Sequence, residues 1–345
     1  MILLTGANGH LGANLLRRLL SDGVAVRVLL RPQSDNSTVD GLDVERACGD
    51  LRDPASLIAA SAGCDAIYHC AAQVSTIAGG GQELFVNNVL GTRNLLRAAL
   101  QTGVRRVVVS GSLSAIGHRP LVPTDETEPF NPFENHLPYS HTKAAVEHEC
   151  LKAVTEGLDV VIAVSCAILG PNDSKPSCMG QVLLDYAHRN LRTYVPGDFE
   201  FVAARDIVEG HVLAMSKGRT GQKYIFSTEF MTIDALFDLY SEVTGQPRPA
   251  LRLSPALMSG LAQISDRVHR YLLPDRRQLL TPAAVRLLRM GRRADCGKAR
   301  SELGYHPGSI AEAVLEAYDW FAARGMIERT RSFVAMGRAG QRTVR

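Results

Sequence analysis

The sequence lacks the features that mark secreted, membrane-spanning and nucleic-acid-binding proteins. None of its 345 residues belongs to an uninterrupted apolar stretch of about 18 residues, the length that crosses a membrane. The opening MILLTGANG has no basic segment ahead of a long apolar one, so we expect no signal peptide and a cytoplasmic protein. A formal net charge of +3 is too small to indicate a nucleic-acid partner.

Cysteine is sparse and scattered. The seven cysteines form no cluster with metal-ligand spacing, and nothing in their odd number suggests a disulfide framework. His141 and His148 lie seven residues apart on one expected helix, whereas paired helical metal ligands stand four apart. His118 follows a serine-rich loop, where an exposed side chain is the expectation. We therefore expect reduced thiols and no metal site.

What the sequence does contain is an alternation of short β-branched runs with longer amphipathic ones. Five strand-like runs alternate with helix-like runs through the first half of the chain. The strands are expected at 1–6, 24–31, 65–72, 105–112 and 158–171, and the helices at 11–23, 53–63, 84–103 and from Tyr139 onward. This order predicts an α/β fold, a doubly wound parallel Rossmann sheet with helices on both faces.

Beyond residue 170 the alternation loosens and helical periodicity dominates. Helices are expected at 177–190, 205–218, 232–245, 255–273 and 309–325. We predict a dinucleotide-binding domain of residues 1–169 plus about 193–227. A smaller, mostly helical substrate-binding domain is predicted for about 170–192 plus 228–327. Residues 328–345 are basic and are expected to form a flexible tail.

A glycine-rich turn, TGANGHLG, connects the first strand to the first helix. Gly6, Gly9 and Gly12 have the spacing G-x-x-G-x-x-G, which leaves the turn free of side chains and opens a helix N-terminus to a pyrophosphate. The alternative is a turn that only packs a strand against a helix. The cofactor-binding residues predicted in this turn are Gly6, Asn8, Gly9, His10, Leu11 and Gly12.

The end of the second strand bears on the choice of cofactor. An NAD enzyme usually has an acidic residue there that binds the ribose 2′-hydroxyl. Here Leu30 and Arg31 occupy the place, and the guanidinium of Arg31 could bind a 2′-phosphate through two hydrogen bonds. We therefore favour NADP(H), with NAD(H) as the alternative. Asp35, the nearest acid, lies farther along in the loop PQSDNST.

Two further strand ends carry cofactor candidates. Asp50 and Leu51, in GDLRD, are placed at the end of a further strand between those at 24–31 and 65–72, where the edge of an adenine could rest. Ala71 and Ala72 end the strand at 65–72 with side chains small enough for a backbone to approach a ligand. Tight packing of a helix is the alternative explanation for the two alanines.

One tyrosine has a lysine four residues later, in the stretch LPYSHTKAAVEHE. Tyr139 and Lys143 are expected on the same face of a helix, and a cation one turn away stabilises a phenolate and lowers the pKa of tyrosine. Ser112, at the end of the strand RRVVVSGS, is placed to give a second hydrogen bond to a carbonyl oxygen. These residues suit hydride transfer to a ketone, with Tyr139 as the proton donor.

The motifs together resemble those of the extended short-chain dehydrogenase/reductases, the NAD-dependent epimerase/dehydratase family. TGANGHLG, GDLRD, HCAA, NNVLGTRNLLRAA, SGSLSAIG and YSHTK occur in the family's order, and the resemblance covers about residues 1–325. The chain most resembles the branch of dihydroflavonol reductases, 3β-hydroxysteroid dehydrogenases and hopanoid-associated sugar epimerases. The resemblance implies a catalytic triad of Ser112, Tyr139 and Lys143, with Lys143 also binding the nicotinamide ribose. It further implies a supporting or cofactor-site role for Asn88, and a homodimer.

Two positions depart from the family pattern. Ser165 replaces a proline common before the Gly-Pro segment, in the loop expected against the nicotinamide. Ile116 replaces a tyrosine that sugar epimerases carry, which favours a less polar substrate.

The sequence therefore favours an NADP(H)-preferring oxidoreductase that interconverts a ketone and a secondary alcohol on an apolar small molecule of steroid, terpenoid or polyketide type. The alternative is a nucleotide-sugar epimerase that retains NAD. A non-catalytic dinucleotide sensor is less favoured, because all three positions of the triad are filled.

Overall fold

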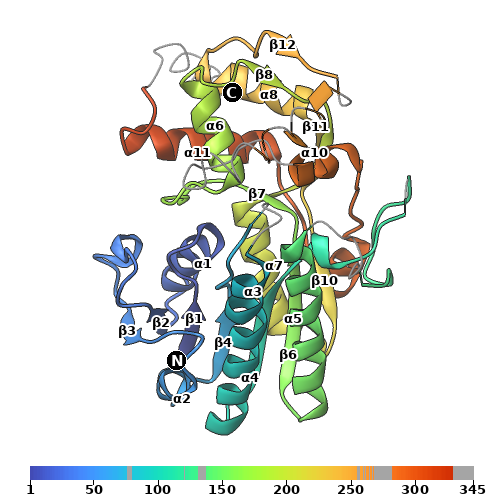
Figure 1. The fold of residues 1–345 in the computed structure, drawn as a ribbon. Coiled ribbons are helices and arrows are strands. Elements are labelled where there is room, and N and C mark those ends of the chain that lie inside the picture. Colours follow the sequence, from blue (N-terminus) through green and yellow to red (C-terminus); the bar gives the residue numbers. More distant parts are fainter. Residues whose placement is uncertain are drawn as a thin grey trace, which may run out of the picture.

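A seven-stranded parallel sheet forms the centre of the computed structural model (Figure 1). The strand order is β10-β6-β5-β4-β1-β2-β3, and every neighbouring pair is parallel. The strands are β1 (Ile2–Thr5), β2 (Val26–Leu30), β3 (Glu45–Cys48), β4 (Ala66–His69), β5 (Arg106–Ser112), β6 (Asp159–Ser165) and β10 (Lys223–Phe226). The structure describes residues 1–75, 80–119, 121–130, 137–254, 257–258, 260, 262–263, 265, 267 and 282–328.

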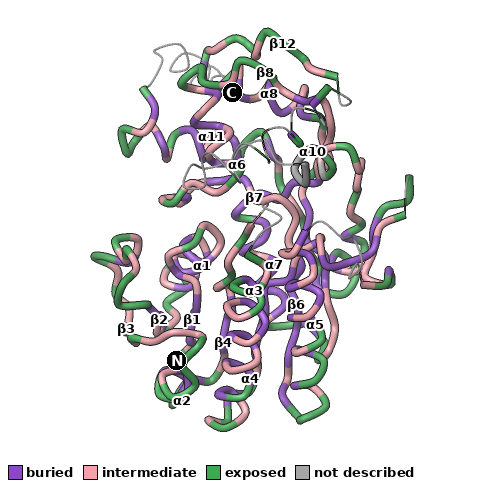
Figure 2. The backbone as a smooth tube through the Cα atoms, in the orientation of Figure 1, coloured by how far each residue is buried: buried purple, intermediate pink, exposed green. Residues whose placement is uncertain are grey.

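Helices cover both faces of this sheet, and each face has its own apolar core. One face carries α1 (His10–Ser21) and α7 (Ala204–Lys217), and the other carries α2 (Pro54–Ser61), α4 (Gly91–Thr102) and α5 (Pro138–Thr155). Alternate strand residues point into the two cores: Val108 and Val161 into one, Val107 and Val160 into the other. The tube in Figure 2 is accordingly coloured as buried along the central strands, such as β4 and β6. The predicted doubly wound Rossmann sheet is confirmed.

The helix predicted over 84–103 is not a single regular α-helix. It begins as α3 (Gly81–Leu84), widens into the π-helix η2 (Phe85–Leu90) and continues as α4. A π-helical turn is rare and is frequently found at functional sites. The turn contains Asn88, which is 2% exposed. The hydrophobic periodicity of the segment carries no signal for such a widening.

A second body with its own apolar core lies above the sheet in Figure 1. Its core is built by α6 (Cys178–Ala187), α8 (Ile233–Thr244) and α11 (Ile310–Ala323), close to the predicted helices. The remaining elements are β7 (Ala167–Leu169), β8 (Thr193–Tyr194), β9 (Asp198–Ala203), β11 (Glu229–Thr232), β12 (Leu251–Arg252), α10 (Pro282–Arg289), η1 (Ser37–Val39), η3 (Leu113–Ala115) and η4 (Ala299–Leu303). Two small sheets, β11-β9-β7 and β12-β8, were not predicted.

The two-domain division stays a prediction, and the structure adds contacts that cross its boundaries. β8 pairs with β12 in the upper body, whereas Ala299, Leu303 and Tyr305 pack into the core of the large sheet. Of the helix predicted over 255–273, the described residues between 257 and 267 are helical and the others lie outside the described part. The predicted tail lies outside it from residue 329 onward. No helix in the described part of the chain is long and apolar enough to cross a membrane.

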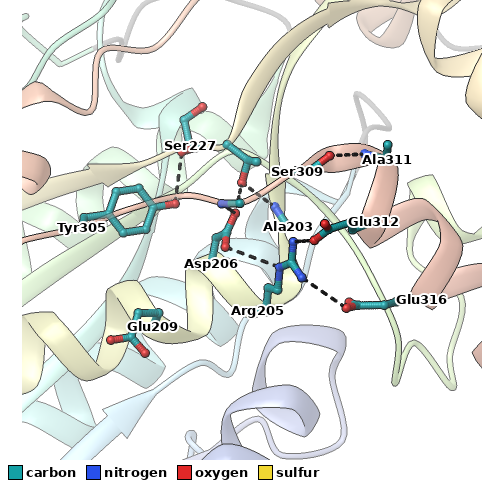
Figure 3. Close-up of polar contacts among 12 residues, drawn as sticks. Ala203, Arg205, Asp206, Glu209, Ser227, Tyr305, Ser309, Ala311, Glu312 and Glu316 are labelled. Atoms are coloured by element: carbon teal, nitrogen blue, oxygen red, sulfur yellow. Dashed lines mark hydrogen bonds and ion pairs between the residues drawn. The ribbon is translucent and has the colours of Figure 1, made fainter. Parts of the chain in front are cut away.

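Polar contacts at the start of α7 join the two bodies (Figure 3). The Asp206 carboxylate accepts hydrogen bonds from the Thr228 hydroxyl at 2.6 Å and the Gly308 amide at 2.9 Å. Arg205 forms ion pairs with Glu312 and Glu316 on α11. The carboxyl end of the sheet, where parallel sheets bind their ligands, therefore faces a body that is fixed to it.

Candidate active site

The glycine loop between β1 and α1 is closely packed against the protein at two of its glycines, and the third leaves the start of α1 clear. Gly6 has φ +80°, and a Cβ at this position would lie 2.6 Å from the Ala71 amide nitrogen. A Cβ at Gly12 would lie 2.1 Å from the Gly6 carbonyl oxygen. Gly9 is the N-cap of α1 and brings no side chain across the first helical N–H groups. The loop therefore fits a pyrophosphate at the N-terminus of α1.

The side chains of the same loop contact other residues of the protein. Asn8 hydrogen-bonds with Asn36 and accepts from the Thr38 hydroxyl at 2.7 Å, which connects the loop to the segment after β2. The His10 imidazole is 9% exposed and its Nδ1 lies 4.0 Å from the Asp173 carboxylate. Burial lowers the pKa of His10, and Asp173 opposes this shift. Leu11 packs against the core beneath α1. The backbone is what this loop presents to a ligand.

Arg31 is exposed at the end of β2, as predicted from the sequence. Its carbonyl oxygen accepts from Asn36 Nδ2 at 3.1 Å, so the following loop is folded back against it. The pKa of Asp50 is lowered first by a hydrogen bond from Arg52 and also by the charge of Arg31. Leu51 packs against α4, where a Cβ on Gly91 would lie 2.8 Å from its Cβ. Arg31, Asp50 and Leu51 thus lie at neighbouring ends of β2 and β3.

The end of β4 lies against the glycine loop. The Ala71 amide donates to Thr5 Oγ1 at 3.3 Å, and Ala72 is exposed. Asn88 lies behind them: its Oδ1 accepts from the Gln73 amide at 2.7 Å, and its Nδ2 donates to the Gln73 carbonyl at 2.9 Å. Its amide is bonded to the protein itself, so its inclusion among the cofactor-binding residues stays a prediction.

The predicted triad comes together at the carboxyl end of β5 and the start of α5. Lys143 Nζ lies 6.0 Å from the centroid of the Tyr139 ring. The Ser112 side chain lies near enough to the Tyr139 phenol to affect its pKa, and the Ser112 hydroxyl shares a hydrogen bond with the Ser114 hydroxyl at 2.9 Å. Lys143 is 6% exposed and donates to the Ser110 carbonyl oxygen at 2.8 Å. Burial lowers the pKa of Lys143 to about 8. A phenol, a hydroxyl and a cation therefore converge at the carboxyl end of β5.

One expectation about these residues is not met. The sequence predicts that Lys143 lowers the pKa of Tyr139, but burial raises that pKa to about 12 and the hydrogen bond from Ser112 opposes the rise. The exclusion of water around the phenol is the largest cause of the raised pKa. Tyr139 is therefore protonated at neutral pH.

The two departures from the family pattern differ in their surroundings. Ser165, at the end of β6, donates to the Gly111 carbonyl at 3.4 Å and is half-buried next to the triad. Ile116 is fully buried in the core beside α5, so its side chain is not in a position to select a substrate. The inference of a less polar substrate from Ile116 therefore has no structural support.

Arg292 is a residue of this region that sequence reasoning missed. Its Nη2 donates to the carbonyl oxygens of Ile116 at 2.7 Å and Gly117 at 2.9 Å, which fixes the segment after the serine-rich turn. Arg292 is 176 residues from Ile116 in the chain, and no local pattern marks such a contact.

The remaining candidates do not form a metal site in the described residues. No group of three or more potential ligands is found in that part of the chain. His148 stacks on Phe130 with 4.4 Å between ring centroids. All seven cysteines are free thiols.

Comparisons with known proteins agree with the fold. The chain is 45% identical over 325 residues to sterol demethylase protein B of Methylococcus capsulatus, covering 94% of this chain and 99% of that protein. It is 32% identical over 330 residues to a dihydroflavonol 4-reductase-like protein of Synechocystis, covering 94% and 95%. It is 29% identical over 299 residues to a 3β-hydroxysteroid dehydrogenase/decarboxylase of Arabidopsis thaliana, covering 81% and 67%.

Solved structures show the same architecture. The crystal structure of gox2253 matches with a TM-score of 0.84 and 33% identity, covering 95% of this chain and 99% of that one. The dTDP-glucose 4,6-dehydratase DesIV of Streptomyces venezuelae, solved with NAD, shares the fold with a TM-score of 0.77 at 24% identity, covering 95% and 98%. The family model described as "NAD dependent epimerase/dehydratase family" matches residues 2–226. The chain is therefore an enzyme of the NAD-dependent epimerase/dehydratase family, as its motifs predicted.

Proposed function

We propose that this protein is an NADP(H)-preferring oxidoreductase that interconverts a ketone and a secondary alcohol on a sterol-like or terpenoid-like small molecule. The observation that carries the proposal is the convergence of Ser112, Tyr139 and Lys143 beside a glycine loop that fits a dinucleotide. A catalytic role for these residues accounts for a buried lysine beside a half-buried tyrosine at the carboxyl edge of a parallel sheet.

The chain's own residues provide the proton chemistry. When bound, the nicotinamide cofactor supplies or accepts a hydride at its C4 position. In reduction, the Tyr139 hydroxyl donates its proton to the oxygen of the substrate carbonyl, and the Ser112 hydroxyl orients that oxygen. A tyrosine whose pKa is raised to about 12 is protonated at neutral pH and is ready to donate. Lys143 holds its charge close to the phenol and would hold the nicotinamide ribose.

The substrate class rests on the relatives. The chain covers nearly the whole of sterol demethylase protein B at 45% identity, and other relatives are a hydroxysteroid dehydrogenase/decarboxylase and a ketoreductase of a farnesylated quinoline oxide. All three names refer to substrates with a large apolar body. They support an apolar alcohol or ketone rather than a nucleotide sugar.

The first experiment is to denature the purified protein and identify the nucleotide that it releases. We expect an empty protein or a partial load of NADP(H), because a reductase exchanges its cofactor in every turnover. A panel of sterol and terpenoid ketones, followed by loss of NADPH absorbance, then tests for activity. Release of NAD at one molecule per chain would overturn the proposal in favour of an epimerase with retained cofactor, and nucleotide sugars would be the next substrates.

Arg31 is proposed to select NADP(H) over NAD(H). Replacing Arg31 with glutamine is expected to weaken NADP⁺ binding about 10- to 100-fold, because hydrogen bonds to a charged phosphate contribute about 1.5–3 kcal/mol. The dissociation constant for NAD⁺ is expected to stay unchanged, since NAD⁺ has no 2′-phosphate. Both constants can be measured by isothermal titration calorimetry.

The matched control is Arg105→Gln, which removes an exposed arginine that pairs with Asp65 at the opposite end of the sheet. It removes the same charge, so a general electrostatic effect would appear in both variants. Equal loss of NADP⁺ and NAD⁺ binding in Arg31→Gln would exclude a role of Arg31 in phosphate recognition.

We also propose that the protein forms a homodimer through α4 and α5 in the cytoplasm. Charged residues line the groove between these helices, including Arg93, Glu149 and Lys152. Phe85, on η2 ahead of α4, and Leu151, on α5, are 43% and 40% exposed. Sedimentation equilibrium of the full chain, with Leu151→Glu as the disrupting variant, tests this assembly.

A further inference from the structure

His69 is a buried histidine at the end of β4 for which the proposed mechanism has no use. It is 3% exposed, and both of its ring nitrogens are hydrogen-bonded. Nδ1 lies 2.7 Å from the Thr5 hydroxyl, one residue before the glycine loop. Nε2 lies 2.9 Å from the Thr92 hydroxyl on α4. The ring therefore joins the end of β1 to α4, a helix that covers one face of the sheet.

The position of each proton in this chain of hydrogen bonds follows from its ends. The Thr92 hydroxyl donates to the Asn88 carbonyl oxygen at 2.6 Å, because a carbonyl can only accept. Thr92 Oγ1 must then accept from His69, so Nε2 carries the ring proton and Nδ1 is an acceptor. Nδ1 accepts from the Thr5 hydroxyl. The oxygen of Thr5 is left free to accept from the Ala71 amide at 3.3 Å.

The chain continues from Asn88 to the helix of the proposed proton donor. Asn88 Nδ2 donates to Thr142 Oγ1 at 3.2 Å, and the Thr142 hydroxyl donates to the Tyr139 carbonyl at 2.8 Å. Asn88 lies in the π-helix η2, where the ladder of backbone hydrogen bonds is widened. The hydroxyl of Thr92 stabilises this turn by bonding to the Asn88 carbonyl.

We propose that His69 is a positioning residue whose single neutral tautomer joins the glycine loop to the helices that carry Asn88 and Tyr139. Its role in turnover rests on the function proposed above. Its role in cofactor binding does not depend on the substrate. Every member of the chain from Thr5 to Tyr139 has one proton assignment that satisfies its partners, and a fully satisfied buried network fixes its residues in one arrangement.

The surroundings of the His69 ring favour its neutral form. Burial lowers the pKa of His69 to about 3, and the nearby charge of Lys143 acts in the same direction. A protonated ring would present an N–H to the Thr5 hydroxyl and a second cation to Lys143. The neutral tautomer avoids both.

Replacement of His69 tests the proposal. His69→Leu is expected to weaken NADP⁺ binding and to lower kcat, each about tenfold or more, because the Thr5 and Thr92 hydroxyls lose a buried partner. His69→Gln can accept with its oxygen and donate with its nitrogen, so it is expected to stay within about threefold of the wild type in both. Thr92→Val keeps the Thr5 contact and is expected to lower kcat while leaving the NADP⁺ dissociation constant within about threefold.

The tautomer of His69 can be measured by spectroscopy on the unmodified protein, so this test does not depend on turnover. Long-range ¹⁵N–¹H correlation spectra of the unmodified full chain, with the His69 signals assigned by their absence in His69→Gln, are expected to show the Nε2–H tautomer from neutral pH down to about pH 5. An Nδ1–H tautomer, or equal impairment of His69→Gln and His69→Leu, would overturn the proposal. If no alcohol or ketone is turned over, the proposed function fails, while the tautomer and the NADP⁺ binding constants still decide the role of His69.

Discussion

Replacing Tyr139 with phenylalanine is expected to lower kcat by about 10²- to 10⁴-fold, the range by which a positioned proton donor accelerates a reaction. The dissociation constant for the cofactor is expected to stay within about threefold, because phenylalanine keeps the aromatic ring and lacks only the hydroxyl. Turnover is measured on the ketone that the substrate panel identifies. Cofactor binding is measured by calorimetry on the same preparations.

The chain offers a matched control for the loss of a buried phenol hydroxyl. Tyr240 is fully buried in the core of the upper body, and its hydroxyl has no hydrogen-bond partner among the described residues. Tyr240→Phe therefore removes the same atom without touching the site, and kcat should not change. If Tyr139→Phe also turned over at the rate of the wild type, Tyr139 would not be the proton donor.

The pH dependence of the reaction follows from the same residue. Because the pKa of Tyr139 is raised to about 12, the protonated form needed for reduction dominates through neutral pH. The oxidation direction needs the tyrosine to accept a proton, and its rate should rise with pH. The sequence alone suggested the opposite balance, since spacing on a helix shows which groups are near each other but does not show how far water is excluded from them.

The large sheet and the glycine loop were predictable because their signals are local. Strand and helix periodicity, the N-cap Asp53 with Pro54 after it, and the spacing of Gly6, Gly9 and Gly12 each concern a few neighbouring residues. The turn places Gly12 against Gly6 so closely that a side chain at Gly12 has no room, which explains the glycine at that position.

The features that could not be predicted depend on contacts between distant segments. Arg292 binds carbonyl groups 175 and 176 residues earlier, and His69 joins β1 to α4 across β4. The π-helical turn around Asn88 also depends on its surroundings, since the amide of Asn88 bonds to Gln73 and Thr142. His69, a polar residue at the end of a buried strand, is visible in the sequence, but the sequence does not show which residues it bonds to.

Acidification is expected to destabilise the fold steeply, because His69 and His211 are buried and neutral. Burial lowers the pKa of His69 to about 3 and that of His211 to about 4, and the charge of Lys143 adds to the shift in both. His211 is fully buried between the Ser110 hydroxyl and the Ile207 carbonyl, each at 2.8 Å. Both residues remain neutral in the folded chain at pH values where a histidine in the unfolded chain is already protonated.

The sign and size of the effect follow from this difference in protons bound. Below a pH of about 6.5 the unfolded chain binds two more protons than the folded chain at these positions, so the free energy of unfolding falls as the pH falls. Between about pH 7.5 and 5.5 the two histidines together should remove roughly 3 kcal/mol. Burial raises the pKa of Glu126, Glu147 and Glu200, and their protonation in the folded chain opposes the loss toward lower pH.

Urea unfolding curves at half-unit steps of pH measure this dependence. The variant His69→Gln, which keeps both hydrogen-bonding functions without a titrating ring, should reduce the loss between about pH 7.5 and 5.5 by roughly half. His188 is exposed at the end of α6, and His188→Gln is the control that should leave the curve unchanged. If the loss between about pH 7.5 and 5.5 were as large in His69→Gln as in the unmodified protein, the ring of His69 would not be held neutral. The tautomer assigned to His69, and with it the hydrogen-bonded connection between the glycine loop and the helix of Tyr139, would then be wrong.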